Sequence, residues 1–267
     1  MAGEITSRSG SLKVVILGAG NVATHLAMAL NEHCEILQIY NRTLQKARAI
    51  ADRINAEAVD DVKDISNDAD LYIIALSDDA ILPTVEKLGK RKGIWVHTSG
   101  STPLEVLAPL SENIGVFYPM QTFTKNVPVH FPDVPLFLEA SSPEVERTLH
   151  SLAEKLTSHV KTISSRQRQL LHIAAVFACN FTDFMWMESA KLLESIGSDF
   201  SVMRPLIDAT FRKAVTYGPK DSLTGPARRG DAKVIARHLG ELSGDTKEIY
   251  RLLSDSIIKT FHEPQHE

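Results

Sequence analysis

Three small residues at fixed spacing offer the clearest chemistry in this sequence. They form the pattern Gly-x-Gly-x-x-Ala after an apolar run at residues 14–17 and before a helical pattern of small and apolar residues. The first glycine permits a tight turn, the second lets a pyrophosphate approach the backbone, and the small third residue lets the helix pack close to the strand. N–H groups at the helix start would hold phosphates. The alternative is an ordinary strand-to-helix turn. The predicted cofactor-binding residues of this turn are Gly18, Gly20, Asn21, Val22 and Ala23.

A second candidate group follows the next predicted strand, residues 35–40, and consists of Asn41, Arg42 and Thr43. In a dinucleotide fold this position meets the adenosine ribose, where an acid binds the 2′-hydroxyl of NAD and a cation accommodates the 2′-phosphate of NADP. Arg42 stands where the acid would be and offers a planar guanidinium to phosphate. The sequence therefore predicts NADP rather than NAD. The tripeptide also suits the cap of the helix predicted at residues 44–54, and both roles can hold at once.

Two further predicted strands, residues 70–76 and 93–97, deliver polar groups to the same edge of the sheet. Because ligands lie across the carboxyl ends of parallel strands, we expect Leu76, Ser77 and Ser99 to contact the cofactor. His97 ends the second of these strands and is a candidate for proton transfer. The alternative for this hydroxyl-rich segment is that it caps a helix beginning at Pro103.

From residue 167 the pattern changes to long helices, and the first, predicted at residues 167–196, carries polar groups on an apolar face. His172 and Asn180 are spaced to lie on one face of it. We predict that His172 handles a proton and that Asn180 orients a carbonyl or hydroxyl group. The alternative is that His172 is a hydrogen-bonded core residue.

The loop at residues 224–231 mixes glycine, proline, arginine and hydroxyl groups between two predicted helices. Its Thr224, Arg228 and Arg229 have the donors for an anion-binding turn, because arginine pairs bidentately with carboxylate or phosphate. Alternatively, Asp231 caps the helix predicted at residues 232–239 and the arginines are solvated. We favour a role in a site or in a dimer.

Length and composition restrict the class of protein. The chain has 267 residues, enough for two domains, and its net charge of -4 argues against a general nucleic-acid binder. Cys34 and Cys179 lack the spacing of a disulfide framework or a metal cluster, so we predict no metal site and a reducing compartment. The first dozen residues are unlike a secretory signal, and the apolar stretch at residues 170–179 is shorter than the about 20 residues needed to cross a bilayer. We expect a cytoplasmic protein without a membrane partner.

The order of elements predicts the fold class. Strands and helices alternate up to residue 163, and only helices follow. We predict an α/β fold with a doubly wound, mostly parallel Rossmann sheet followed by an all-α second domain. The predicted domains are residues 12–164, which bind the dinucleotide, and residues 165–262, which serve substrate binding and dimerisation.

Six segments together resemble a known family: GAGNVATHLA, YNRT, VHTSGSTPLEVL, YPMQTF, ACNF and LTGPARRGD. The family joins an N-terminal Rossmann-like NADP-binding domain to a C-terminal helical domain of unknown function. It is related to pyrroline-carboxylate reductases, deazaflavin-dependent NADP reductases and 6-phosphogluconate or 3-hydroxyisobutyrate dehydrogenases. The resemblance spans residues 12–261 and implies an active cleft between the domains and a homodimer formed through the helical domain.

The chain departs from these relatives at one position that matters for the mechanism. Relatives acting on hydroxy acids carry a proton-relaying lysine four residues before the asparagine that Asn180 matches, and here that position is Val176. His172, one turn earlier, is the candidate substitute. Family members often carry histidine where this chain has Tyr118, which weakens any role transferred to that position.

Three functions are compatible with these features. The first is an NADP-dependent oxidoreductase that transfers a hydride to or from a small carbonyl, imine or hydroxyl substrate, with Asn180, His172 and His97 as catalytic residues. The second is a non-catalytic NADP-binding sensor or interaction protein, favoured by Val176. The third, a site for S-adenosylmethionine, is disfavoured by Arg42, because that ligand usually requires an acid at this position.

Overall fold

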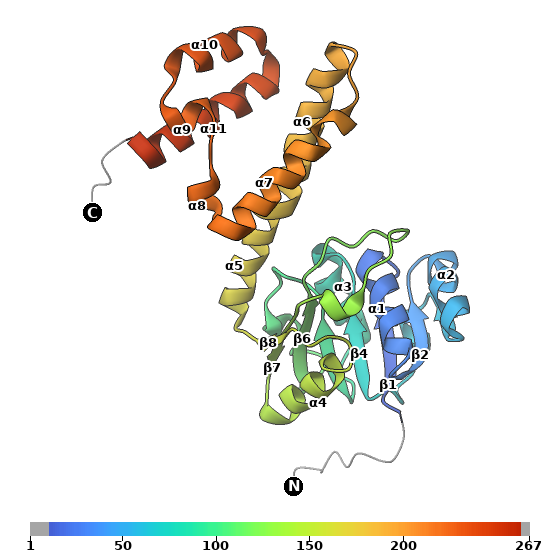
Figure 1. The fold of residues 1–267 in the computed structure, drawn as a ribbon. Coiled ribbons are helices and arrows are strands. Elements are labelled where there is room, and N and C mark those ends of the chain that lie inside the picture. The colour runs from blue at the N-terminus through green and yellow to red at the C-terminus, as the bar shows by residue number, and fades with distance from the viewer. Residues whose placement is uncertain (1–10, 263–267) are drawn as a thin grey trace. The chain divides into compact units, whose positions relative to one another are not determined.

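The computed structural model describes residues 11–262 and contains an eight-stranded sheet with the order β3-β2-β1-β4-β5-β6-β7-β8 (Figure 1). Neighbouring strands are parallel except for β6 and β7, which pair antiparallel. This is the predicted doubly wound, mostly parallel fold. The strands are β1 (Lys13–Leu17), β2 (Glu35–Tyr40), β3 (Glu57–Val59), β4 (Leu71–Ile74), β5 (Ile94–His97), β6 (Ile114–Pro119), β7 (Leu136–Ala140) and β8 (Val160–Thr162).

Both faces of the sheet are covered because the central strands are apolar on both sides. In β1, Val14 and Ile16 belong to the buried cluster on the face covered by α1 (Asn21–Asn31), α2 (Leu44–Ile54) and α4 (Pro143–Ala153), whereas Val15 and Leu17 belong to the cluster on the opposite face, which α3 (Asp78–Leu88) covers. Side chains alternate along a strand, so an unbroken apolar run is what a strand buried on two faces requires.

Several local predictions differ from the structure. The segment predicted to form a helix from Pro103 is a short 3-10 turn, η2 (Leu104–Leu107), and β3 is a strand that we did not predict. β3 has only three residues and is an edge strand that pairs with β2. Its sequence therefore has no long apolar pattern from which a strand could be predicted. The remaining short 3-10 turns are η1 (Val62–Asp64), η3 (Phe131–Asp133) and η5 (Phe200–Met203).

The long helix predicted at residues 167–196 is a continuous helical run with a wider turn inside it. It comprises α5 (Ser165–Ala175), the π-helical turn η4 (Val176–Asn180) and α6 (Phe181–Ser195). The run of 31 residues, Ser165–Ser195, is long and apolar enough to cross a membrane by length and composition, and none of its most apolar window is buried. This helix is longer than the apolar stretch at residues 170–179, from whose length we expected no membrane span.

The chain divides into two compact units, residues 1–179 and 180–267, of which the structure describes 11–179 and 180–262. This boundary falls later than the predicted one after residue 164. α5 belongs to the sheet-containing unit because its first turns are anchored there by Arg168, which is completely buried. The predicted second domain starts at residue 165, where α5 begins, whereas in the structure α5 is part of the first unit.

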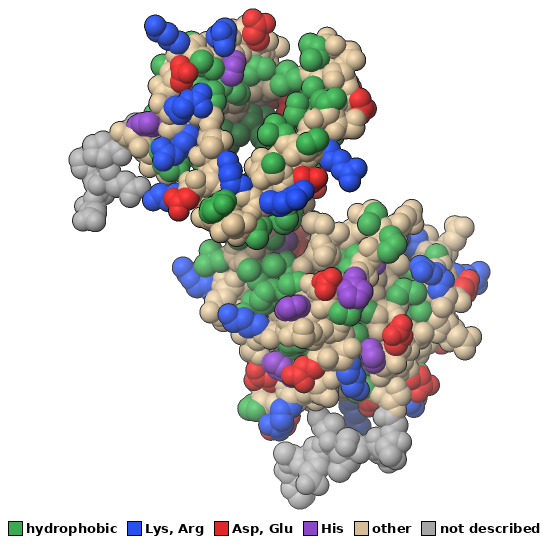
Figure 2. All heavy atoms as spheres, viewed as in Figure 1, with side chains coloured by type: hydrophobic (Ala, Val, Ile, Leu, Met, Phe, Trp, Pro, Cys, Tyr) green, Lys and Arg blue, Asp and Glu red, His purple; other side chains and the backbone are tan. Residues whose placement is uncertain are grey.

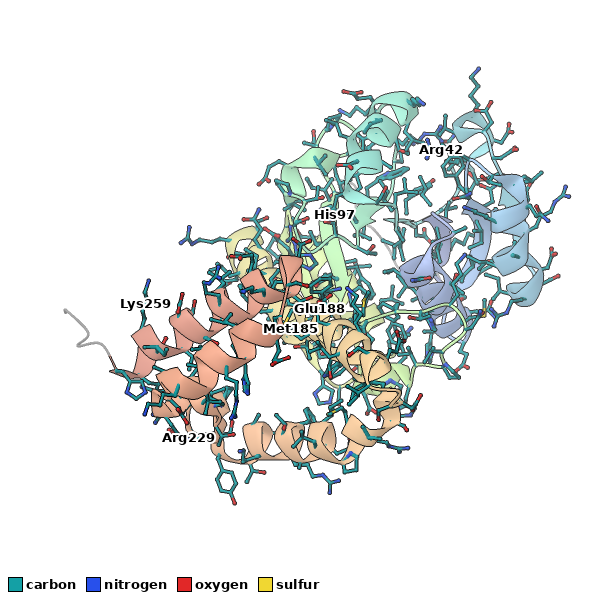
Figure 3. The ribbon with its side chains drawn as sticks, turned by 90° about the horizontal axis from the view of Figure 1, so that it is seen from above. Arg42, His97, Met185, Glu188, Arg229 and Lys259 are labelled. Atoms are coloured by element: carbon teal, nitrogen blue, oxygen red, sulfur yellow. The ribbon has the colours of Figure 1, made fainter. Side chains whose placement is uncertain are left out.

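The second unit is all-helical, as predicted. Its Glu188, on α6, accepts a hydrogen bond from Thr246, which ties the beginning of α11 (Gly244–His262) to α6. The same carboxylate forms an ion pair with Lys191. Figure 3 labels Glu188 and its neighbour Met185. The other helices are α7 (Arg204–Tyr217), α8 (Pro219–Ser222), α9 (Pro226–Arg229), α10 (Ala232–Glu241) and α11 (Gly244–His262).

Candidate functional site

A pocket lies at the carboxyl ends of the parallel strands, where the chain leaves β1, β2 and β4. Its volume is about 560 Å³, and its wall includes Ala19 and Gly20 at the start of α1. Gly20 is the N-cap of α1, so the unpaired N–H groups of the first helical turn begin at this wall. The position is that of a phosphate-binding site in open α/β sheets.

The two glycines of the turn have different roles. Gly18 has a φ of 131°, and a Cβ there would collide with the carbonyl oxygen of Ala75, so the close approach of β1 and β4 requires glycine. At Gly20 a Cβ would meet nothing within 4 Å. Gly18 is therefore needed by the fold, whereas the open space at Gly20 is available to a bound group, as the spacing predicts.

Four cations line this pocket, and they come from four segments of the chain. Arg42 follows β2, as Figure 3 shows, and Lys46 lies in the first turn of α2. Lys87 comes from the last turn of α3, and Lys125 from the irregular segment after β6. Asp79 is the one acidic residue in the described wall. The pocket therefore favours an anionic ligand, and a phosphate carries the charge and acceptors that Arg and Lys bind.

The structure brings five of the predicted cofactor residues together in the pocket wall: Gly20, Asn41, Arg42, Leu76 and Ser77. Lys87 and Lys125 also line it but were missed, because neither directly follows a predicted strand and nothing local in their sequence indicates a site. Thr84, inside α3, was missed for the same reason, whereas Tyr40 was missed although it ends β2.

The other predicted cofactor residues are not in the pocket wall. Ala23 is completely buried in the core beside the sheet. Asn21 donates a hydrogen bond from Nδ2 to the Phe123 carbonyl oxygen at 2.8 Å. Val22 packs against the core, and Thr43 is the N-cap residue of α2 without a side-chain cap bond.

Ser99 organises the turn that follows β5. Its Oγ accepts hydrogen bonds from the N–H groups of Ser101 (3.1 Å) and Thr102 (2.9 Å). Ser101 in turn donates a hydrogen bond to the Asp78 carboxylate at the start of α3. These bonds hold the turn after β5 against the beginning of α3, which follows β4. Ser99 itself is buried.

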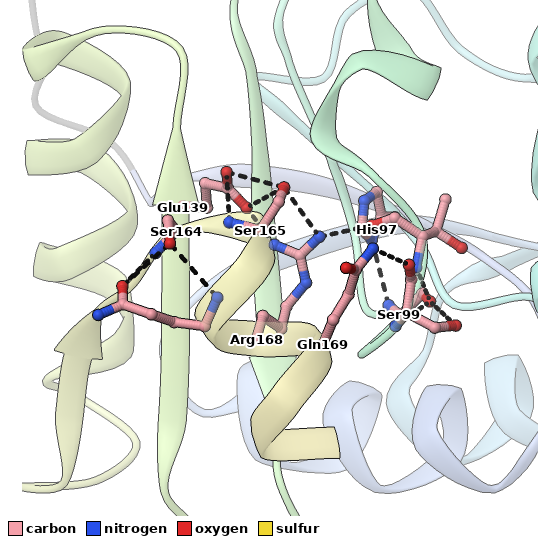
Figure 4. Close-up of polar contacts among 10 residues, drawn as sticks. His97, Ser99, Glu139, Ser164, Ser165, Arg168 and Gln169 are labelled. Carbon is pink, nitrogen blue, oxygen red and sulfur yellow. Dashed lines mark hydrogen bonds and ion pairs between the residues drawn. The ribbon is translucent and has the colours of Figure 1, made fainter. Parts of the chain in front are cut away.

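His97 is completely buried at the end of β5. Its Nδ1 accepts a hydrogen bond from the Ser99 N–H at 3.2 Å, as Figure 4 shows, so the neutral ring carries its proton on Nε2. Burial and the nearby positive charge of Arg168 lower the pKa of His97 to about 4. In this geometry the imidazole is neutral at pH 7 and supports the Ser99 turn.

Arg168, in the first turn of α5, links three segments inside the sheet-containing unit (Figure 4). It forms an ion pair with Glu139 of β7 and donates a hydrogen bond to the Thr102 carbonyl oxygen. Ser165 adds hydrogen bonds from its N–H (3.0 Å) and its hydroxyl (2.9 Å) to the same carboxylate. The guanidinium thus fixes α5 to β7 and to the turn after β5.

His172 lies one turn further along α5 and is half-buried. Its Nδ1 is 3.1 Å from the hydroxyl of Tyr118, the penultimate residue of β6. The backbone of Gly100 packs against the same edge of the ring, since a Cβ there would lie 2.7 Å from Cγ and Nδ1. The structure therefore brings His172 to the carboxyl ends of β5 and β6, and it is the more accessible of the two predicted histidines.

Asn180 is exposed and is the last residue of the π-helical turn, with no side-chain cap bond among the described residues. Val176 is the first residue of that turn, so the position of the relatives' lysine coincides with a local change of helix type.

In the segment 224–231, which contains the short helix α9, Asp231 accepts a hydrogen bond from the Val234 N–H at 3.3 Å and caps α10, as one alternative predicts. The solvated arginines of that alternative are not found at Arg228, which is half-buried. The Arg228 guanidinium stacks on the Phe261 ring at 4.0 Å from its centroid. Its neighbour Arg229 is labelled in Figure 3.

Two family models match the chain. The model described as shikimate/quinate 5-dehydrogenase matches residues 1–93, which contain the glycine turn and Arg42. The model described as a domain of unknown function, DUF2520, matches residues 134–257. We find no match among curated proteins.

Solved structures match over almost the whole chain. An imine reductase from Myxococcus stipitatus, in complex with NADP+, is 14% identical, with a TM-score of 0.63 and coverage of 94% of this chain and 93% of its own. A 1-pyrroline-5-carboxylate reductase from Streptococcus pyogenes is 16% identical, with a TM-score of 0.64 and coverage of 93% and 98%. At these identities the likeness shows a shared fold.

A third structure is much more similar. It is named "putative NADP oxidoreductase" from Bacteroides fragilis, is 42% identical, covers 93% of this chain and 98% of its own, and has a TM-score of 0.88. Together with the two family models, this similarity shows that the chain belongs to the family in which a Rossmann-like domain precedes a DUF2520 domain.

Proposed function

We propose that the protein is an NADP-dependent oxidoreductase acting on a small carbonyl, imine or hydroxyl substrate. The observation that carries this proposal is the pocket in which the glycine turn and four cations meet. A dinucleotide with a third phosphate needs more positive charge at the adenosine ribose than NAD does. Arg42 and Lys46 would hold that 2′-phosphate, and Gly20 with the start of α1 would hold the pyrophosphate.

The chain's own groups position and polarise the substrate. Bound NADPH supplies a hydride to an electrophilic carbon. In the reducing direction the Nε2–H of neutral His172 donates a hydrogen bond to the substrate oxygen or nitrogen, which receives the electron pair of the C=O or C=N bond and takes a proton from water. Asn180 is proposed to orient the substrate through its amide. His97, being buried, is proposed to hold the Ser99 turn in place.

The cofactor preference is tested by one substitution and a matched control. Arg42→Ala should weaken NADPH binding roughly 10- to 100-fold, the value of one charge-assisted interaction, and NADH binding much less. Arg53→Ala removes an exposed cation of the neighbouring helix α2 that lies outside the pocket wall, and should change neither affinity. Titration followed by NADPH fluorescence gives both constants, and equal losses for the two cofactors would refute the role of Arg42.

Turnover separates this proposal from the second candidate function. Val176, in place of a proton-relaying lysine, favours a non-catalytic NADP-binding sensor or interaction protein. A panel of small carbonyls, cyclic imines and hydroxy acids, followed by NADPH absorbance, should contain a substrate whose turnover is lost in His172→Gln and in Asn180→Ala. Tight NADPH binding with no turnover across all three classes would support the sensor.

The partner proposed for the helical unit is a second copy of the chain. α7 has fourteen residues and not one of them is buried, although it carries Leu206, Phe211 and Val215. Exposed apolar surface of this kind marks an interface. We also place the protein in the cytoplasm, which the two free cysteines support.

A further inference from the structure

We propose that Tyr118 is the positioning residue of His172, and that it holds the neutral imidazole in the tautomer whose Nε2 carries the proton and is free to meet a substrate. The inference rests on the proposed function, in which the Nε2–H of His172 donates a hydrogen bond to the substrate. It concerns only residues of the sheet-containing unit.

The geometry confines one side of the ring. The Tyr118 hydroxyl lies 3.1 Å from Nδ1, and the two rings meet edge-on, with centroids 6.1 Å apart and planes at 73°. Gly100 covers Cγ and Nδ1 closely enough that any side chain would collide with the ring. Among the described residues no atom forms a hydrogen bond with Nε2, so Nδ1 is held and Nε2 is available.

The direction of the hydrogen bond follows from what a buried phenol needs. Tyr118 is only 8% exposed, and within the described chain its hydroxyl has His172 as its one hydrogen-bond partner. If Nδ1 carried the proton and donated it, the phenolic hydrogen would be buried without an acceptor, which costs about 1–3 kcal/mol. If Tyr118 donates to Nδ1, both groups are satisfied, and the ring proton resides on Nε2.

The charges around Tyr118 keep it a donor. Burial raises the pKa of its hydroxyl; the positive charge of Arg168 opposes this shift and the negative charge of Asp78 adds to it. The hydroxyl therefore stays protonated at neutral pH.

Nitrogen NMR of the histidine side chains tests the tautomer without any substrate. At pH 9, where histidines are neutral, the wild-type protein labelled with 15N should show His172 with a protonated Nε2 and an accepting Nδ1, assigned by loss of the signals in His172→Gln. A protonated Nδ1 in the wild type would overturn the proposal.

Two variants extend the test. In Tyr118→Phe the tautomer ratio should shift about fivefold toward protonated Nδ1, the equivalent of one hydrogen bond, and Gly100→Ala should shift it in the same direction by displacing the ring. The matched control is Tyr72→Phe, which removes another buried hydroxyl, bonded to the Ser66 carbonyl oxygen at 2.8 Å, and should leave the His172 signals unchanged. Unchanged His172 signals in Tyr118→Phe would also overturn the proposal.

Kinetics separate this inference from the proposed function. With a substrate found in the panel, Tyr118→Phe should lower kcat about fivefold or more and leave KM for NADPH unchanged, whereas Tyr72→Phe should alter neither. A tautomer held by Tyr118 in a protein whose turnover survives His172→Gln would refute the role of His172 in turnover while leaving the positioning by Tyr118 intact.

Discussion

Two histidines with the same sequence-based role differ in the structure because their surroundings differ. His97 is enclosed at the end of a central strand, where charge is costly, and its accepting nitrogen is occupied by a backbone N–H. His172 is half-buried on a helix and keeps one nitrogen open. Burial, and not residue type, therefore decides which imidazole can exchange a proton.

The buried His97 should make the protein's stability depend on pH. Its folded-state pKa of about 4 lies below the ordinary value of 6.5, so the unfolded chain binds a proton more readily. Its contribution is fully present above pH 6.5 and is lost as pH falls toward 4, by about 3 kcal/mol in total for a pKa lowered from 6.5 to about 4.

His97→Asn keeps an acceptor for the Ser99 N–H but cannot be protonated in this range. Urea unfolding at pH 7, 5.5 and 4.5 should therefore show a shallower loss of stability in the variant than in the wild type. Parallel pH curves for the two proteins would exclude His97 as the cause.

At the scale of elements, the sequence predicts strands and helices well where their apolar pattern is regular. The segments predicted at residues 35–40 and 44–54 coincide with β2 and α2. The turn at Gly18 and the cation at Arg42 are also predictable, because each directly follows a strand. Lys125 is not, since it lies in an irregular segment whose path depends on tertiary packing.

The first turn of α5 also escaped sequence analysis. An arginine near the start of a helix is normally solvated, and nothing local indicates that Arg168 pairs with Glu139, 29 residues away. The pairing needs β7 to lie beside the helix, which only the assembled sheet determines. The predicted start of the helical domain at residue 165 stays a prediction, and the structure assigns α5 to the sheet-containing unit.

Removing Arg168 should destabilise the sheet-containing unit more than removing an exposed arginine. Arg168→Met leaves Glu139 without its partner and should lower the free energy of unfolding by about 3–5 kcal/mol in urea denaturation at pH 7. Arg147→Met breaks the exposed pair with Glu144 and should cost less than about 1 kcal/mol.

The double variant Arg168→Met/Glu139→Leu replaces both charges and should recover part of the loss. If Arg168→Met proves no more destabilising than Arg147→Met, the buried pair does not anchor α5.

At the scale of the whole molecule, the described helices expose far more apolar surface than a solitary chain would favour. Figure 2 shows hydrophobic side chains gathered over the helical unit, and Phe211 and Tyr217 of α7 are each 68% exposed. Two explanations fit a long apolar helix: a membrane and a second subunit. The ion-paired Glu188 in the middle of α6 favours the subunit, because a charged pair is costly in a lipid bilayer.

Charged substitutions on α7 should disrupt this proposed dimer. Phe211→Glu and Val215→Glu, one turn apart on one face, should convert the dimer to a monomer in sedimentation equilibrium. Leu82→Glu changes an exposed leucine of α3, outside the helical unit, and should leave the dimer intact. A wild type that is monomeric at every concentration, or that floats with phosphatidylcholine vesicles, would contradict the dimer.

The antiparallel pairing of β6 and β7 affects which face of α5 must point toward Tyr118. Because β7 and β8 run opposite to the other strands, the chain leaves the sheet at the edge remote from the pocket, and α5 must carry His172 back toward Tyr118. Arg168 and His172 are four residues apart, so the guanidinium anchored to Glu139 sets the face on which the imidazole appears. Each residue inserted between them would turn the imidazole by about 100°. Insertions and deletions between these two residues would be tolerated only in combinations that return His172 to the same face of α5.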